Sequence, residues 1–205
     1  TPTEYFDSIG LYDFGGGEYH CVWLSEHDME IFSARGLTAV TCPASNAKLA
    51  SGVAPLTEFM RRGIPLAVGT DGPSSNNALD MFREMYLACV LQKLRERDAA
   101  ACPAEDILLA ACSGGARATG LADCDCLADG KQADIAVIDL DRPNMRPIHS
   151  PARNLVYSGS KENVRLTMVA GRILYENGEF FVGDDPGRIC AEAERHTKEL
   201  IEDGN

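Results

Sequence analysis

The chain has 205 residues, of which 45% are hydrophobic and 24% are charged, and this mixture is typical of a chain that folds around a core. Its 19 basic and 31 acidic residues give a formal net charge of −12, which argues against a nucleic-acid partner and favours a neutral or cationic ligand. No stretch approaches the roughly 18 consecutive apolar residues of a membrane span, so an integral membrane protein is excluded.

The cysteines do not form the pattern of a disulfide scaffold or of a zinc finger. The eight cysteines are Cys21, Cys42, Cys89, Cys102, Cys112, Cys124, Cys126 and Cys190. Cys21, Cys42, Cys89 and Cys112 lie inside apolar runs, where a free thiol behaves as a small hydrophobic group. There is no Cys-x-x-Cys pair, and residues 124–126 (Cys-Asp-Cys) are expected to form a turn. We therefore expect reduced thiols and a cytoplasmic protein.

In the first part of the chain, short apolar runs alternate with helices. A short opening helix ends at the glycines of residues 15–17. The predicted strands are residues 18–24, 37–42 and 64–69; the predicted helices are residues 26–35, 55–62, a long amphipathic helix with apolar positions from Leu79 to Leu94, and residues 104–119; residues 46–52 and 73–77 are predicted loops. Near-continuous apolar strands separated by helices indicate parallel βα units with both sheet faces covered.

After residue 120 the pattern changes to short antiparallel strands. Residues 133–140 are a predicted strand, and residues 164–182 contain three more, joined at Ala170-Gly171 and at Asn177-Gly178. Asn-Gly between two β runs is a strong hairpin signal, because both residues tolerate positive φ. Residues 186–204 are predicted to form a charged helix on the surface.

Two residues lie where catalytic side chains gather in parallel βα proteins, at the carboxyl ends of strands. Asp71 follows the third predicted strand, and Gly72 leaves its carboxylate open to a metal ion. The alternative is a turn in which Asp71 bonds its own backbone. His20 falls within the first predicted strand, where it is either a catalyst or a hydrogen-bonded core residue. The residues alone leave both alternatives open.

Further polar residues follow the second predicted strand. Ser45 and Asn46, with Lys48 and Gly52, either line a polar ligand or satisfy a turn. Residues 74–77 are expected to cap the long helix that follows them. The three remaining histidines are expected to be solvated: His27, His149 and His196.

Several longer segments carry a resemblance to a known family. They are, in chain order, HCVWLS at residues 20–25, CPASNAKLASGVAPL at 42–56, GTDG at 69–72, SSNNALDMFREM at 74–85, LACVLQK at 87–93, GKQADIAVIDLD at 130–141 and MVAGRILYENGEF at 168–180. The first three segments resemble the sixth, seventh and eighth strands of the amidohydrolase superfamily. The next two are similar to the branch that deaminates methylthioadenosine and S-adenosylhomocysteine, and the last two resemble the small β-sandwich beside the barrel.

The resemblance implies an α/β fold, namely the C-terminal part of a (β/α)8 TIM-type barrel (strands 6–8) plus part of a small β-sandwich domain. The implied domains are a partial metal-dependent hydrolase barrel at residues 1–122, a small β-rich domain at 123–183 and a C-terminal helix at 184–205.

The resemblance also implies one divalent metal ion, zinc or iron, which turns a bound water into a nucleophile near neutral pH. Asp71 would ligate the metal and take the water's proton. His20 would hydrogen-bond the water or the oxyanion that develops when the ring carbon bearing the amino group is attacked. The implied reaction is hydrolytic deamination of a nucleoside-like substrate with release of ammonia. Ser45 and Asn46 are the candidate substrate contacts.

Most of the family's metal ligands do not occur in this sequence. The family carries a His-x-His pair on its first strand and a histidine on its fifth, followed three residues later by a glutamate. No His-x-His occurs here, and the spacing of the second pattern occurs only at His27/Glu30 and His196/Glu199, where the histidines belong to charged helices and are expected to be solvated. The chain begins with Thr1 rather than Met, and three βα units cannot close a barrel of about 250 residues. We therefore expect the C-terminal half of a metal-dependent deaminase, lacking the metal and inactive alone. Its apolar edges favour a homo-oligomer or pairing with the missing N-terminal half.

Other interpretations stay open. The chain could belong to an amidohydrolase acting on a guanine- or triazine-type ring, or it could be a non-catalytic binding or assembly module that keeps the fold without a metal. A flavodoxin-like ligand-binding domain also fits the βα pattern. It lacks a phosphate-cradling glycine loop before a helix, however, since the glycines of residues 15–17 precede a strand.

Overall fold

The computed structural model describes residues 1–203, which divide into two compact units. Unit 1 comprises Thr1–Lys131 and Asp139–Asn163, and unit 2 comprises Gln132–Ile138 and the chain from Val164 onward. Residues 139–163 therefore pack with unit 1, although they lie inside the range that the sequence assigns to the small domain. The predicted domain boundaries stay a prediction.

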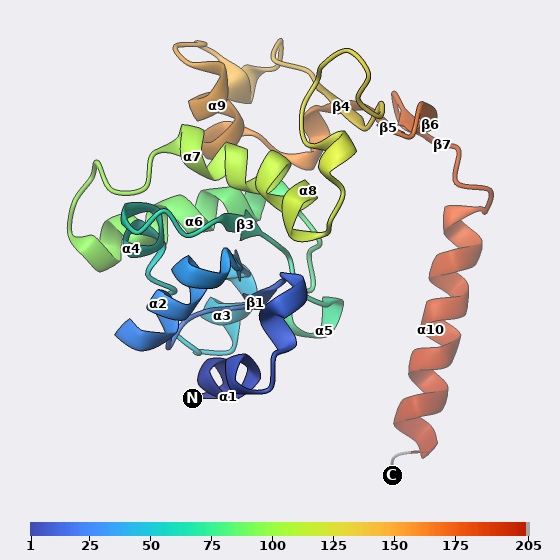
Figure 1. Cartoon of the computed structure of the whole chain (residues 1–205). Helices are drawn as coiled ribbons and strands as arrows, with labels where there is room; N and C mark the ends of the chain where they lie inside the picture. Colours follow the sequence, from blue (N-terminus) through green and yellow to red (C-terminus); the bar gives the residue numbers. More distant parts are fainter. Residues whose placement is uncertain (204–205) are drawn as a thin grey trace. The chain divides into compact units, whose positions relative to one another are not determined.

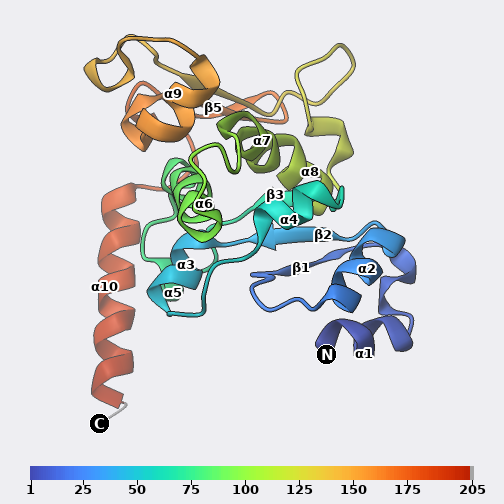
Figure 2. The same ribbon diagram turned by 90° about the vertical axis from the view of Figure 1, so that its left-hand side faces the viewer.

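Unit 1 is built on a three-stranded parallel sheet with helices between its strands (Figures 1 and 2). The strands are β1 Gly17–Tyr19, β2 Thr38–Thr41 and β3 Leu66–Val68, in the order β1-β2-β3. Both pairings are parallel, and all four side chains of the central strand β2 are buried. Helices lie between each strand and the next along the chain, as parallel strands require. This arrangement confirms the predicted parallel βα units.

The helices of unit 1 follow local sequence signals. The α-helices are α1 Pro2–Ser8, α2 Glu26–Arg35, α3 Pro43–Lys48, α4 Leu56–Arg61, α5 Pro73–Asn76, α6 Met81–Glu96, α7 Ala104–Leu109, α8 Gly115–Ala118 and α9 Pro151–Ser158. In α2 the Ser25 hydroxyl accepts from the Asp28 N–H while the Asp28 carboxylate accepts from the Ser25 N–H, and the helix ends at Gly36 with φ of 65°. This capping box and glycine end confirm the predicted helix at residues 26–35.

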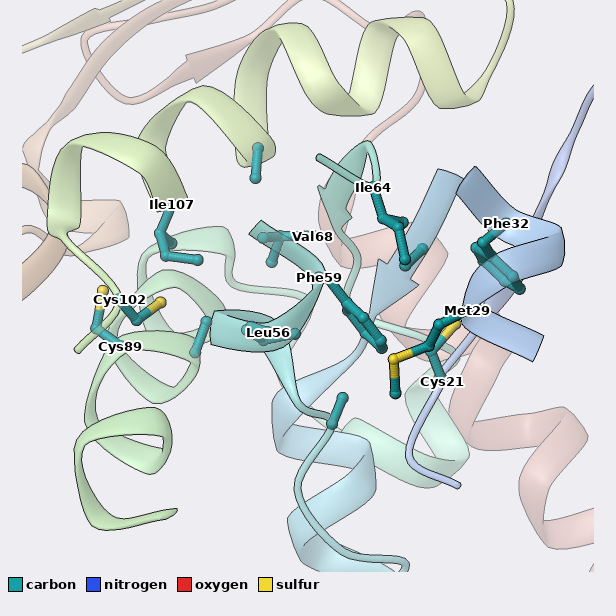
Figure 3. Packing of buried hydrophobic residues seen from close by; sticks show 14 of the residues in the cluster. Cys21, Met29, Phe32, Leu56, Phe59, Ile64, Val68, Cys89, Cys102 and Ile107 are labelled. Atoms are coloured by element: carbon teal, nitrogen blue, oxygen red, sulfur yellow. The ribbon is translucent and has the colours of Figure 1, made fainter. Parts of the chain in front are cut away.

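The core of unit 1 joins the sheet to the surrounding helices. Phe32, Leu37, Phe59 and Ile107 are each 0% exposed. Figure 3 shows the side chains of Leu56, Phe59, Ile64, Val68 and Ile107 in one cluster with Met29 and Phe32. Burying aromatic and branched aliphatic side chains in this way stabilises the fold by about 1.5–3 kcal/mol for each side chain.

Three local expectations are wrong. The predicted strand at residues 18–24 ends at Tyr19, because His20 and Cys21 have positive φ of 69° and 50°, which breaks the extended backbone. The predicted loop at residues 46–52 begins inside α3, which starts at Pro43. The predicted loop at residues 73–77 contains the short helix α5.

The long helix is capped by a different residue from those predicted. The Asp80 side chain accepts from the N–H groups of Phe82 and Arg83, so α6 begins at Met81. Leu79, counted in the amphipathic pattern, lies before the helix and is exposed.

The predicted helix at residues 104–119 is continuous but not uniform. Between α7 and α8 it contains a π-helical segment, Ala110–Gly114. A Cβ atom added to Gly114 would lie 2.2 Å from the Leu66 carbonyl oxygen of β3. Glycine at this position therefore allows the helix to approach the sheet closely.

Unit 2 is an antiparallel meander followed by a helix. Its strands are β4 Ile135–Ile138, β5 Val164–Val169, β6 Arg172–Glu176 and β7 Glu179–Phe180, paired in chain order. Asn177 and Gly178 turn between β6 and β7 with φ of 48° and 99°, as the hairpin signal predicts. Helix α10, Pro186–Asp203, follows, and the predicted helix is confirmed up to Asp203; Gly204 lies outside the described residues.

All eight cysteines are free thiols, in agreement with the prediction. Cys21, Cys42 and Cys89 are buried as expected, whereas Cys112 is exposed and Cys102 is buried. Over residues 1–203, no helix combines the length and apolarity needed to cross a membrane.

Candidate active site

The carboxyl ends of the three parallel strands deliver polar side chains into one cavity of about 440 Å³. His20 directly follows β1, Ser45 lies in α3 after β2, and Asp71 follows β3 after two residues. Because parallel strands end at the same edge of a sheet, residues far apart in the sequence meet here. All three residues line the cavity, and its volume is in the range of small-molecule sites.

Asp71 is held by hydrogen bonds on both carboxylate oxygens. Its Oδ2 accepts from the hydroxyls of Ser45 at 2.6 Å and Ser75 at 2.7 Å, and its Oδ1 accepts from the Gly72 N–H at 2.7 Å. These bonds, the Ser45 hydroxyl first, lower the pKa of Asp71 to about 2. The carboxylate is therefore ionised at neutral pH. Its backbone φ is 60°, in the left-handed region that a residue other than glycine seldom adopts.

The sequence analysis placed His20 in a strand, but the residue follows β1 and its side chain is 45% exposed. The imidazole Nδ1 lies 2.8 Å from the Asn46 Oδ1, and Nε2 lies 4.0 Å from Asp71 Oδ2. The Asn46 oxygen accepts the Nδ1 proton, and Nε2 is the ring atom that faces the carboxylate. A separation of 4.0 Å is too long for a hydrogen bond.

Two buried residues that sequence reasoning missed hold the strand-end loops together. Glu84, 0% exposed in α6, accepts from the Ala44 N–H at 2.9 Å and from the Asn76 side-chain amide at 2.8 Å. The same Asn76 amide donates to the Thr70 carbonyl at 2.6 Å. Glu84 is thus linked to the residue before Ser45 and, through Asn76, to the residue before Asp71.

The residues expected to cap α6 instead belong to this edge of the site. Ser75 bonds Asp71, and Lys48 Nζ donates to the Ser74 carbonyl at 3.0 Å and to Asn77 Oδ1 at 2.5 Å. No local pattern signals the two Lys48 contacts, since their partners lie 26 and 29 residues further along the chain. The three other histidines are exposed and line none of this cavity: His27, His149 and His196.

The side chains at the site are too few to hold a zinc ion by themselves. Zinc is bound by about four ligands, or by three with one open position. Asp71 and His20 offer one carboxylate and one imidazole, and within residues 1–203 no group of three or more His, Cys, Asp or Glu side chains could hold a metal ion. Burial raises the pKa of Cys21 to about 12 and that of Cys42 to about 11, so neither neighbouring thiol is a thiolate at neutral pH.

Comparisons with known proteins match almost the whole chain. Residues 1–174 match the model of the Amidohydrolase family. A protein from Natronomonas pharaonis named 5-methylthioadenosine/S-adenosylhomocysteine deaminase is 42% identical over 200 residues, which are 98% of this chain and 46% of that protein. A 5'-deoxyadenosine deaminase from Methanothermobacter thermautotrophicus is 41% identical over 89% of this chain and 42% of its own length.

Solved structures give the same result. An adenosine deaminase from Xanthomonas campestris with bound zinc superposes with a TM-score of 0.91 at 34% identity, over 98% of this chain and 46% of that one. An atrazine chlorohydrolase from Arthrobacter aurescens complexed with zinc superposes with a TM-score of 0.86 at 26% identity, over 95% of this chain and 43% of that one. The chain spans about half the length of the curated relatives it matches. The family match over most of its residues shows that the chain belongs to the amidohydrolase family.

Proposed function

We propose that this chain supplies Asp71 and His20 to a metal-dependent hydrolytic deaminase of an adenosine-type substrate. In this proposal β1, β2 and β3 are strands 6–8 of a TIM-type barrel, and β4–β7 are part of its small β-sandwich. The observation that carries the proposal is the convergence of His20, Ser45 and Asp71 from three successive strand ends on one cavity. The names of the deaminase relatives support the substrate class.

The geometry suggests distinct tasks for the two residues. Asp71 is ionised at neutral pH, so it offers a carboxylate oxygen to a cation or to the proton of a water. The Asn46 contact fixes the His20 ring with Nδ1 as the donor, which leaves Nε2 to accept a hydrogen bond from a water O–H in the space beside Asp71. A catalytic group must reach the reacting atoms by one hydrogen bond, and both side chains line the same cavity.

The remaining metal ligands must come from outside the described residues. Asp71 and His20 do not complete a zinc site, so we propose that the chain alone binds no zinc tightly and releases no ammonia. After dialysis against metal-free buffer, elemental analysis of the purified chain should find less than about 0.1 zinc per chain. About one zinc per chain would contradict this proposal.

A chimera tests the activity itself. The part of the Natronomonas pharaonis deaminase that precedes its matched 200 residues would be joined to Thr1, and the metal-loaded product assayed for ammonia release from 5'-methylthioadenosine, S-adenosylhomocysteine, guanine and a triazine. We expect activity on the first two substrates. Asp71→Ala should lower kcat/KM by at least about 10³-fold, as expected for loss of a residue that handles a proton. The exposed Asp129 provides a matched control, since Asp129→Ala should leave the rate unchanged.

The outcomes separate the alternatives. Activity on guanine or a triazine alone would assign the chain to another branch of the family. A folded, metal-loaded chimera that is inactive on all four compounds would favour a non-catalytic binding or assembly module.

A further inference from the structure

Trp23 lies in the loop between β1 and α2 and is 84% exposed, although tryptophan carries the largest apolar ring of any residue. It is the one tryptophan of the sequence. The residue lines the same cavity as His20, Ser45 and Asp71. An indole ring at the wall of a ligand-sized cavity provides a flat apolar surface there.

The indole is fixed rather than free to rotate. Its Nε1–H donates to the Ser51 carbonyl at 3.0 Å. The Ser51 N–H in turn donates to the Asn46 carbonyl at 2.9 Å, and Asn46 is the residue that contacts His20. The ring is thus tied by two hydrogen bonds to the residue that orients the histidine.

The neighbouring glycine leaves space for this arrangement. Gly52 has φ of 122°, and a Cβ atom there would lie 2.8 Å from Val22 Cγ1 and 3.6 Å from Trp23 Cζ2. The backbone of residues 51–52 therefore passes close against one edge of the indole. A ring held by one edge keeps its faces at a constant position without a further loss of side-chain entropy on binding.

The chemistry of the cavity indicates which ring would stack there. Glu18, Asp28 and Asp71 line it together with Trp23, so a neutral ligand is favoured over an anion. Trp faces bind flat heteroaromatic rings by stacking, whatever their hydrogen-bonding edges. A neutral purine nucleoside meets both conditions, whereas a nucleotide adds a negatively charged phosphate.

We propose that Trp23 is the aromatic platform on which the purine ring of the substrate stacks, in the cavity that holds His20 and Asp71. This inference rests on the proposed deaminase function and adds a substrate-binding residue to it. In the chimera, Trp23→Ala should therefore raise KM for 5'-methylthioadenosine by about tenfold while kcat changes by less than about threefold.

Binding to the 205-residue chain tests the platform without catalysis or metal. Because the chain has a single tryptophan, its fluorescence reports on Trp23 alone. Adenosine should quench this emission saturably, ribose should not, and AMP should need a higher concentration. Equilibrium dialysis with radiolabelled adenosine then compares the variants. Trp23→Phe should bind within about threefold of the unchanged chain, and Trp23→Ala should bind at least about tenfold more weakly.

Leu94 of α6 provides the matched control, because this apolar side chain is 74% exposed and does not line the cavity. Leu94→Ala should change adenosine binding by less than about twofold, and circular dichroism should show that every variant keeps its helix content. Equal binding by Trp23→Ala and the unchanged chain overturns the platform and leaves the deaminase proposal intact. No saturable quenching at millimolar adenosine also overturns it, whatever the chimera does. Quenching by adenosine with an inactive chimera contradicts the deaminase proposal instead.

Discussion

The two sheets of this chain differ in what they bury. In the parallel sheet all four side chains of β2 are buried, and Ala39 of that strand belongs to the same core cluster as Phe32 and Phe59. In the antiparallel sheet β4–β7, no described strand residue is buried. The first sheet is therefore stabilised by a core, whereas the second depends on hairpin pairing and half-buried contacts.

The two units also differ in where non-glycine residues with positive φ lie. Both sheets contain non-glycine residues with positive φ, but Ala170 and Asn177 in unit 2 lie in turns beside glycines. In unit 1 such residues include His20, Cys21 and Asp71, which line the candidate active site. Such conformations cost of order 1–3 kcal/mol and persist only where the surroundings determine them. The buried sheet and the Glu84 contacts provide those surroundings.

The largest expected effect comes from exchanging a phenylalanine for alanine in each unit. Phe59 is fully buried in α4, so Phe59→Ala should lower the free energy of unfolding of unit 1 by about 3–5 kcal/mol. Phe180 of β7 is 58% exposed and contacts the ring of Tyr175 at a centroid distance of 5.1 Å, so Phe180→Ala should cost about 1 kcal/mol or less. Urea unfolding followed by circular dichroism measures both. Equal losses would contradict the contrast between the sheets.

Glutamates give the next comparison. Glu84→Ala leaves the Ala44 N–H without its acceptor and removes one of the two acceptors of the Asn76 amide, so the free energy of unfolding should fall by about 2–3 kcal/mol. Glu176 is exposed at the end of β6, and Glu176→Ala should change the free energy of unfolding by less than about 0.5 kcal/mol. Urea unfolding of both variants is the measurement. A loss below 1 kcal/mol for Glu84→Ala would show that this buried carboxylate does not hold the strand-end loops.

Local signals predict those elements whose ends are determined by their own residues. The helix at residues 26–35 follows from Ser25 and Gly36, and the hairpin follows from Asn177-Gly178. The end of β1 could not be predicted in this way, because nothing in the neighbouring residues requires the left-handed backbone of His20. That residue contacts Asn46, which lies 26 positions further along the chain.

The same reasoning divides the candidate site. Asp71 and Ser45 could be selected from the sequence because each follows the end of a predicted strand. His20 was selected as a histidine within a predicted strand, and a family resemblance supports all three. Glu84 lies inside an amphipathic helix and bonds Ala44, 40 residues away, so no spacing rule indicates its position. The predicted strand at residues 18–24 included Trp23. In the structure β1 ends at Tyr19, so Trp23 lies in a loop and is exposed.

Two adjacent glycines test how closely the helices approach the buried sheet. A Cβ atom at Gly114 would lie 2.2 Å from the Leu66 carbonyl oxygen, so Gly114→Ala should lower the free energy of unfolding by about 1–3 kcal/mol. Gly115 has helical backbone with φ of −60° and nothing within 4 Å of an added Cβ atom. Gly115→Ala should therefore raise the free energy of unfolding by about 0.5–1 kcal/mol. Melting temperatures that shift in the same direction for both variants would contradict the close approach.

The smallest effect is a dependence on pH that distinguishes the buried carboxylate from exposed ones. Burial raises the pKa of Glu84 above its ordinary value of 4.5, although the Ala44 N–H and the Asn76 amide oppose the shift. The folded protein therefore holds this proton more tightly than the unfolded chain does. The stability that the proton contributes is complete below pH 4.5 and is lost as the pH rises through the folded pKa.

Glu84→Gln removes this titration while keeping the shape of the side chain. The free energy of unfolding of the unchanged protein should fall relative to that of Glu84→Gln as the pH rises from 4.5 to 7, measured by urea unfolding at each pH. The amide adds a constant offset at all pH values, so the slope of the difference is the test. A slope of the opposite sign would mean that the hydrogen bonds from Ala44 and Asn76 outweigh burial at Glu84. These contacts to the strand-end loops would then favour the charged carboxylate.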